Sequence, residues 1–131
     1  EESSDRDFKL HWSLCPRTYI APYTPTPLEI NGDINKEEWS RIPWSSPYVD
    51  ITGGEEGGPS STQRTQMKLA WDEEYLYIAA ILHSDFPVVA SFRNRNDPIY
   101  QRDSDFEVFL DPLHSCHNYK ELEVNPINTV W

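Results

Sequence analysis

The stretch that decides the fold is residues 103–131, DSDFEVFLDPLHSCHNYKELEVNPINTVW. It contains two short segments, 105–111 and 118–126, in which apolar and polar residues alternate, and a polar turn joins them. Alternation with a period of two places one set of side chains on the buried face of a β-sheet and the other set on the opposite face. We therefore expect an antiparallel hairpin in which four carboxylates share one face: Asp105, Glu107, Glu121 and Glu123.

Four neighbouring carboxylates repel one another unless a cation, a basic side chain or sugar hydroxyl groups compensate them. Asp103 and Asp105 have the D-x-D spacing that offers two oxygen ligands from one strand end, and Asp111 follows at the other end of that strand. Calcium prefers such oxygen ligands, so Asp103, Asp105 and Asp111 are the candidate metal ligands. The alternative is an acidic edge that faces solvent.

The rest of the chain also predicts strands. Segments 65–71 and 75–83 form a second hairpin around an acidic turn, and 75–83 is apolar on both faces, which is typical of a central strand. Shorter strands are expected at 17–21, 28–30, 48–51 and 86–92, and Asn35 is the expected cap of a helical turn that turns Ile34 and Trp39 inward. Short strands, frequent turns and little helix predict an all-β fold of six to eight strands, an antiparallel β-sandwich.

Length and composition limit the function classes. The 131 residues suffice for one domain, which we place at 17–131 after a polar, extended segment at 1–16. A net charge of −11 argues against nucleic acid and against an anionic membrane surface as partners. No apolar run is long enough for a membrane span, and no signal peptide is visible. Cys15 and Cys116 can form one disulfide or remain two unrelated thiols.

Three stretches resemble the family 9-like carbohydrate-binding modules, which are related to the DOMON β-sandwiches. PLEINGDINKEEWSRIPW (27–44) is similar to the phrase with which those modules open. MKLAWDEEYLYIAAIL (67–82) is similar to their W-D-D-E-Y-L-Y hairpin, and 103–131 is similar to their D-x-D-F-E-V-F-x-D-P…N-T-V-W segment. The ordered matches cover most of the chain.

The resemblance implies a jelly-roll-like sandwich that binds carbohydrate without cleaving it, in an extracellular or cell-surface protein of polysaccharide degradation. It also implies structural calcium, which some members hold. Family members continue past the N-T-V-W phrase with more strands. We therefore expect a sheet that is incomplete at its C-terminal end, with an open edge that missing strands or another chain cover.

Aromatic rings stack on sugar rings, and planar polar side chains bond the hydroxyl groups. The loop 93–102 (RNRNDPIYQR) is rich in such polar groups, and acceptors and aromatic residues lie on the neighbouring strands. The candidate carbohydrate-binding residues are Trp71, Arg93, Arg95, Tyr100, Glu107, Tyr119, Asn125 and Trp131.

Two other functions remain open. A glycoside hydrolase needs two carboxylates about 5–5.5 or 6.5–9.5 Å apart, and Glu107 and Glu123 can meet that condition across a hairpin. A structural fragment without ligand binding is the other alternative. No Ser–His–Asp set and no H-E-x-x-H motif is visible.

Overall fold

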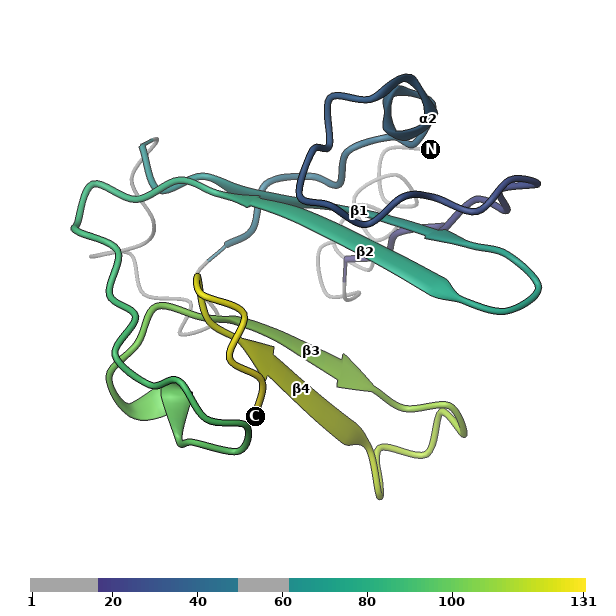
Figure 1. Ribbon diagram of the computed structural model, residues 1–131. Helices are drawn as coiled ribbons and strands as arrows, with labels where there is room; N and C mark the ends of the chain where they lie inside the picture. Colours follow the sequence, from purple (N-terminus) through teal and green to yellow (C-terminus); the bar gives the residue numbers. More distant parts are fainter. Residues whose placement is uncertain (1–16, 50–61) are drawn as a thin grey trace, which may run out of the picture. The chain divides into compact units, whose positions relative to one another are not determined.

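The computed structural model describes residues 17–49 and 62–131, and these form an all-β fold with almost no helix (Figure 1). Its strands make two small antiparallel sheets, β1–β2 and β3–β4. The chain divides between His83 and Ser84 into two compact units, each of which contains one of the sheets. Within the described residues, no helix is long and apolar enough to cross a membrane.

The sheet of the first unit is the predicted hairpin of β1 (Thr65–Trp71) and β2 (Leu76–Leu82), paired from Thr65↔Leu82 to Trp71↔Leu76. Asp72 builds the turn between them. Its Oδ1 accepts hydrogen bonds from the backbone N–H groups of Glu74 (2.8 Å) and Tyr75 (2.7 Å), and its Oδ2 accepts one from the Tyr77 hydroxyl (2.6 Å). These bonds lower the pKa of Asp72, and the side chain therefore stays an ionised acceptor at the turn.

The core of the first unit lies on one face of this sheet. Ala70, Tyr77 and Ala79 point from the strands into a cluster with Leu28, Trp39 and Ile42. Trp39 is presented by α2 (Glu37–Ser40), a single helical turn, and Ile34 packs against the same cluster. The inward positions predicted for Ile34 and Trp39 are thus confirmed. A short helical turn is enough here because its burial, rather than its own hydrogen bonds, stabilises it.

A lysine is buried on the same face of β1. Lys68 is 4% exposed, donates a hydrogen bond from Nζ to the Trp39 carbonyl (2.6 Å), and lies 4.5 Å above the centre of the Trp44 ring. Burial lowers the pKa of Lys68. The carbonyl and the π-face of Trp44 compensate part of the hydration that the ammonium group loses.

Several sequence predictions for this unit were wrong. The N-cap of the helical turn is Lys36, which makes no side-chain capping hydrogen bond, and not Asn35. Asn35 lies one residue earlier, where its backbone N–H donates to Asp33 Oδ1 (3.0 Å) in an Asx turn. Residues 17–21 and 28–30 form no strand; Tyr23 makes a single bridge to Trp71. Tyr48 and Val49 are extended but belong to no strand, and the remainder of the 48–51 prediction lies outside the described residues.

The interior strand of this sheet is also a different one from that predicted. In the described part of the chain β2 pairs with β1 alone, while β1 also receives hydrogen bonds at its other edge from Ser45 (to Met67 O, 2.8 Å) and Tyr48 (to Thr65 O, 2.9 Å). β1 is therefore the interior strand. The apolar character of 75–83 reflects two partly covered faces rather than a central position.

The second unit contains the hairpin of β3 (Phe106–Leu110) and β4 (Lys120–Val124), which confirms the predicted pairing. At the other edge of β4, Glu123 and Trp131 exchange both backbone hydrogen bonds (3.2 and 3.1 Å), and Val124 bridges Val130. The short 3₁₀ helix η1 (Ile99–Gln101) contacts β4 and buries Ile99 completely. The strand expected at 86–92 is absent, and the described residues hold four strands rather than six to eight.

Replacing Trp39 tests the core of the first unit. Trp39 is 2% exposed, so Trp39→Ala leaves a cavity and should lower the free energy of unfolding by about 3–5 kcal/mol. Trp44→Ala is the control: this ring is 38% exposed and interacts with Lys68, so we expect a loss of about 1 kcal/mol. Urea titration followed by circular dichroism measures both, and equal losses would contradict the assigned core.

Candidate functional site

The carboxylates of the second unit gather on one face of the β3–β4 hairpin, as the alternation predicts. In the observed register Glu107 lies directly opposite Glu123, and Phe109 lies opposite Glu121. Residues paired across an antiparallel ladder point to the same side, and so do residues two apart on one strand. Asp105, Glu107, Glu121 and Glu123 therefore share this face, which we call the acidic face.

Three of these residues form a tight group. Asp105, Glu107 and Glu123 each bring one carboxylate oxygen to within 4.8 Å of the oxygens of the other two. We call this group the acidic trio. Glu123 is only 3% exposed, Asp105 is half-buried and Glu107 is exposed, so the trio runs from the interior to the surface. Glu121, the fourth carboxylate, remains outside the group and exposed.

Two oxygens of the trio are buried without a partner. Among the described residues, neither Asp105 Oδ2 nor Glu123 Oε2 has a hydrogen-bond partner. A buried carboxylate oxygen without a partner is costly, because it loses its hydration and gains nothing in return. The trio is thus a place in the unit where charge is concentrated but not compensated.

The electrostatics agree with the geometry. Burial, followed by the charges of Asp105, Glu107 and Glu121, raises the pKa of Glu123. Burial and the charge of Asp103 raise that of Asp105, and burial with Asp105 and Glu121 raises that of Glu107. The pKa of each carboxyl in the trio is raised because burial, and after it the like charges of the neighbours, disfavour the ionised form.

An aromatic pair borders the acidic face. Trp131 lies opposite Glu123 in the backbone pairing, so its side chain is on the acidic face. The Tyr100 ring contacts the Trp131 ring edge to face, with 5.4 Å between centroids. Tyr100 is 51% exposed and Trp131 is 37% exposed. The sequence proposed these residues as ligand contacts separately, and the structure places them together.

Asn125 and Asp103 tie the surrounding segments to this face. Asn125 Nδ2 donates to the Phe92 carbonyl (3.0 Å) and to Asp103 Oδ2 (2.8 Å), and its Oδ1 accepts the backbone N–H of Thr129 (2.8 Å). Asp103 also accepts hydrogen bonds from Ser91. Burial raises the pKa of Asp103, but the hydrogen bonds from Ser91 and Asn125 outweigh it and lower the pKa to about 2.

The predicted metal ligands are therefore distributed over different roles. Both oxygens of Asp103 accept internal hydrogen bonds, and Asp111 Oδ2 accepts the backbone N–H of Cys116 (2.6 Å) in the β3–β4 loop. Of the three predicted metal ligands, Asp105 is the one that belongs to the acidic trio. Glu107 and Glu123 were both missing from the predicted metal ligands, although the alternating pattern already placed them on the same face as Asp105.

The predicted carbohydrate-binding residues are likewise divided. Arg93 and Arg95 are exposed on the loop before η1, and the Tyr119 ring packs on Phe109 at 5.6 Å. Trp71 belongs to the first unit, where its Nε1 donates to the Ala21 carbonyl (3.2 Å) and its ring contacts Tyr23. Asn125 is 4% exposed, and its amide is engaged in the bonds described above.

The predicted disulfide stays a prediction. Cys116 is exposed in the β3–β4 loop, and its possible partner Cys15 lies outside the described residues.

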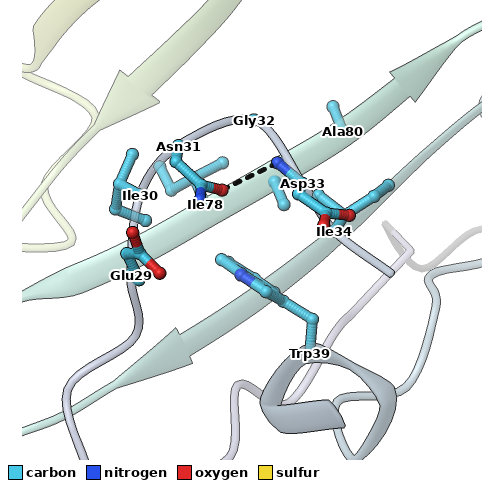
Figure 2. A pocket seen from close by; sticks show the side chains of 10 residues that line it. Glu29, Ile30, Asn31, Gly32, Asp33, Ile34, Trp39, Ile78 and Ala80 are labelled. Carbon is cyan, nitrogen blue, oxygen red and sulfur yellow. Dashed lines mark hydrogen bonds between the residues drawn. The ribbon is translucent and has the colours of Figure 1, made fainter. Parts of the chain in front are cut away.

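Two pockets lined by described residues of the first unit contain none of the candidate site residues. One, of about 170 Å³, lies between the turn at residues 29–34, Trp39 and strand β2 (Figure 2). Figure 2 shows Asn31 Oδ1 turned back to accept the backbone N–H of Asp33 (3.0 Å), so this polar group serves the turn. Glu29 forms an ion pair with Lys36. The polar side chains Asn31 and Glu29 that line this pocket are thus engaged by the protein itself. The acidic face therefore remains the candidate site.

Comparison with protein-family models, with curated proteins and with solved structures finds no match to this chain. The likeness to carbohydrate-binding modules therefore rests on the motifs quoted above.

Substitution can test whether the buried hydrogen bonds of the Asn125 side chain stabilise the second unit. Asn125→Ala leaves the buried Thr129 N–H without its partner and removes one of the two donors to the Phe92 carbonyl, so we expect a loss of about 1–3 kcal/mol in the free energy of unfolding. Asn94→Ala removes an exposed amide that makes one 3.3 Å hydrogen bond to Asp97 and should change stability little. Chemical denaturation measures the free energy of unfolding of both variants. An Asn125→Ala variant as stable as the natural protein would contradict this stabilising role of Asn125.

The raised pKa of Glu123 predicts a dependence of stability on pH. The stability that this group contributes is fully present below its pKa in the unfolded chain, about 4.3, and is lost as pH rises through the higher pKa in the folded chain. Glu123→Gln cannot ionise, so its melting temperature should rise relative to the natural protein as pH increases from about 4 to 7.

Thermal melts at several pH values, without divalent cations, measure this difference. Glu73→Gln, which removes an exposed charge from the β1–β2 turn, provides the matched control and should show no such trend. A constant difference between Glu123→Gln and the natural protein across this range would contradict the prediction.

Proposed function

We propose that this chain is a β-sandwich module that binds carbohydrate non-covalently at the Tyr100–Trp131 pair and the adjoining acidic face. The observation that carries the proposal is the exposed aromatic pair beside a set of carboxylates on one sheet face. Aromatic rings with free faces offer the apolar surface on which a sugar ring stacks. Carboxylate oxygens accept hydrogen bonds from its hydroxyl groups.

The loop before η1 supplies the complementary donors. Arg93 and Arg95 are exposed there and carry planar guanidinium groups that donate several hydrogen bonds in fixed directions. Glu107 is the exposed member of the acidic trio and the natural acceptor for a bound hydroxyl group. Asn125 supports this arrangement through its hydrogen bond to the Phe92 carbonyl. Because Asn125 is buried, we expect the exposed residues around it, and not Asn125 itself, to contact the ligand.

The jelly-roll-like sandwich is part of the proposal. Each sheet has an apolar face outside the core cluster described above, with Met67, Leu69 and Ile78 in the first unit and Phe106, Val108 and Val124 in the second. These faces are only partly buried, and a second sheet is the usual cover for such a face. The motif resemblance supports the same architecture and an extracellular role beside polysaccharide-degrading enzymes.

Substitution of the aromatic pair tests the binding surface. On a glycan array we expect binding by the natural protein, and Tyr100→Ala or Trp131→Ala should weaken it roughly tenfold, which corresponds to about 1.4 kcal/mol. Tyr75→Ala is the control, because Tyr75 is comparably exposed in the other unit. Full-strength binding by both variants of the pair would exclude this surface.

The same preparation separates the binding module from a hydrolase. Glu107 lies directly opposite Glu123 on one face of the hairpin, and this pair of facing carboxylates keeps a glycoside hydrolase as the second candidate. A binding module releases no reducing sugar from the polysaccharide that it binds. Release that is lost in Glu107→Gln would establish the hydrolase instead.

A further inference from the structure

Among residues 17–49 and 62–131, no salt bridge compensates the acidic trio. In the described part of the chain, the salt bridges are Lys36–Glu29 and Arg41–Glu37, and neither involves the trio. The one Lys of the hairpin, Lys120, is paired with Leu110 and so belongs to the opposite face. Like charges that lie this close require a counter-charge or protons.

The buried atoms show where a counter-charge fits. Glu123 is 3% exposed, its Oε2 has no hydrogen-bond partner among the described residues, and the same is true of Asp105 Oδ2. One oxygen from each member of the trio lies within 4.8 Å of the others. Oxygens bound to one Ca²⁺ at about 2.3–2.6 Å lie no farther apart than about twice that distance.

From this geometry we propose that Asp105, Glu107 and Glu123 hold one hard divalent cation of the Ca²⁺ or Mg²⁺ class. Three carboxylates supply hard oxygen ligands, which such ions prefer over the nitrogen and sulfur ligands typical of zinc. Sequence spacing around Asp103 predicted a cation nearby. The side chains that meet in space come from β3, from the residue before it and from β4, and Asp105 is the one predicted ligand among them.

The site has a route for the ion and room for further ligands. Glu107 is exposed and Glu123 is buried, so an ion enters from solvent on the Glu107 side and is held from the interior by Glu123. Three protein oxygens leave positions for water in the coordination shell of either ion. The proposal does not depend on carbohydrate binding, because all three ligands are the protein's own.

Titration of the full, chelator-treated chain with CaCl₂ and, separately, MgCl₂ tests the site in the absence of any sugar. We expect a saturable rise in melting temperature and binding heat by calorimetry with at least one ion. Glu123→Gln and Glu107→Gln should each weaken binding at least tenfold. Glu121→Gln removes a charge from the same face outside the trio and should weaken binding much less than either trio variant, because its carboxylate supplies no ligand.

Circular dichroism without metal confirms that each variant is folded, and Glu107→Gln keeps the test valid if Glu123→Gln is not, because Glu107 is exposed. Absence of heat and of any melting shift with both ions would overturn the proposal and leave protons as the counter-charge. Binding that survives unchanged in both trio variants would also overturn it. A chelator-insensitive glycan array signal bears on carbohydrate binding alone, so the two proposals fail separately.

Discussion

The side-chain amide of Asn125 is the contact on which the second unit depends. Its two ends bond backbone groups at Phe92 and Thr129, and its Nδ2 also reaches Asp103, so one side chain at the end of β4 fixes the segments on either side of the hairpin. The Thr129 hydroxyl donates to the same Phe92 carbonyl (2.8 Å). A buried amide with its donors and acceptor engaged specifies one arrangement, since any other leaves polar groups unpaired.

The burial of Glu123 follows from this arrangement. The segment that ends at Trp131 lies beside β4, and η1 contacts the same strand, so Glu123 has neighbours that an isolated hairpin would lack. Folding thus draws a carboxylate out of water next to Asp105 and Glu107, at a cost in free energy. Carboxylates whose pKa values are raised by burial and by neighbouring charges are frequent at functional sites. This agrees with the proposal that the trio binds an ion.

The carbohydrate and the cation that we propose would contact different parts of the same face. The exposed rings of Tyr100 and Trp131 suit an apolar sugar surface, whereas the oxygens of the trio suit a hard ion. Glu107 is common to both, because it is the member of the trio that solvent reaches. The acidic face therefore joins rigid aromatic groups to charge within one small unit, without requiring anything of the first unit.

The sequence by itself determined the two hairpins and the sharing of one face by four carboxylates, because period-two alternation and turn residues act locally and read directly as strand geometry. It also indicated the buried Trp39. It failed for 28–30 and 86–92, where apolar residues occur without a strand partner. Only the tertiary structure decided that Asp103 anchors a loop while Glu123 joins Asp105 and Glu107. Burial and hydrogen-bond partners come from segments distant in the chain, and no local pattern encodes which carboxylate they satisfy.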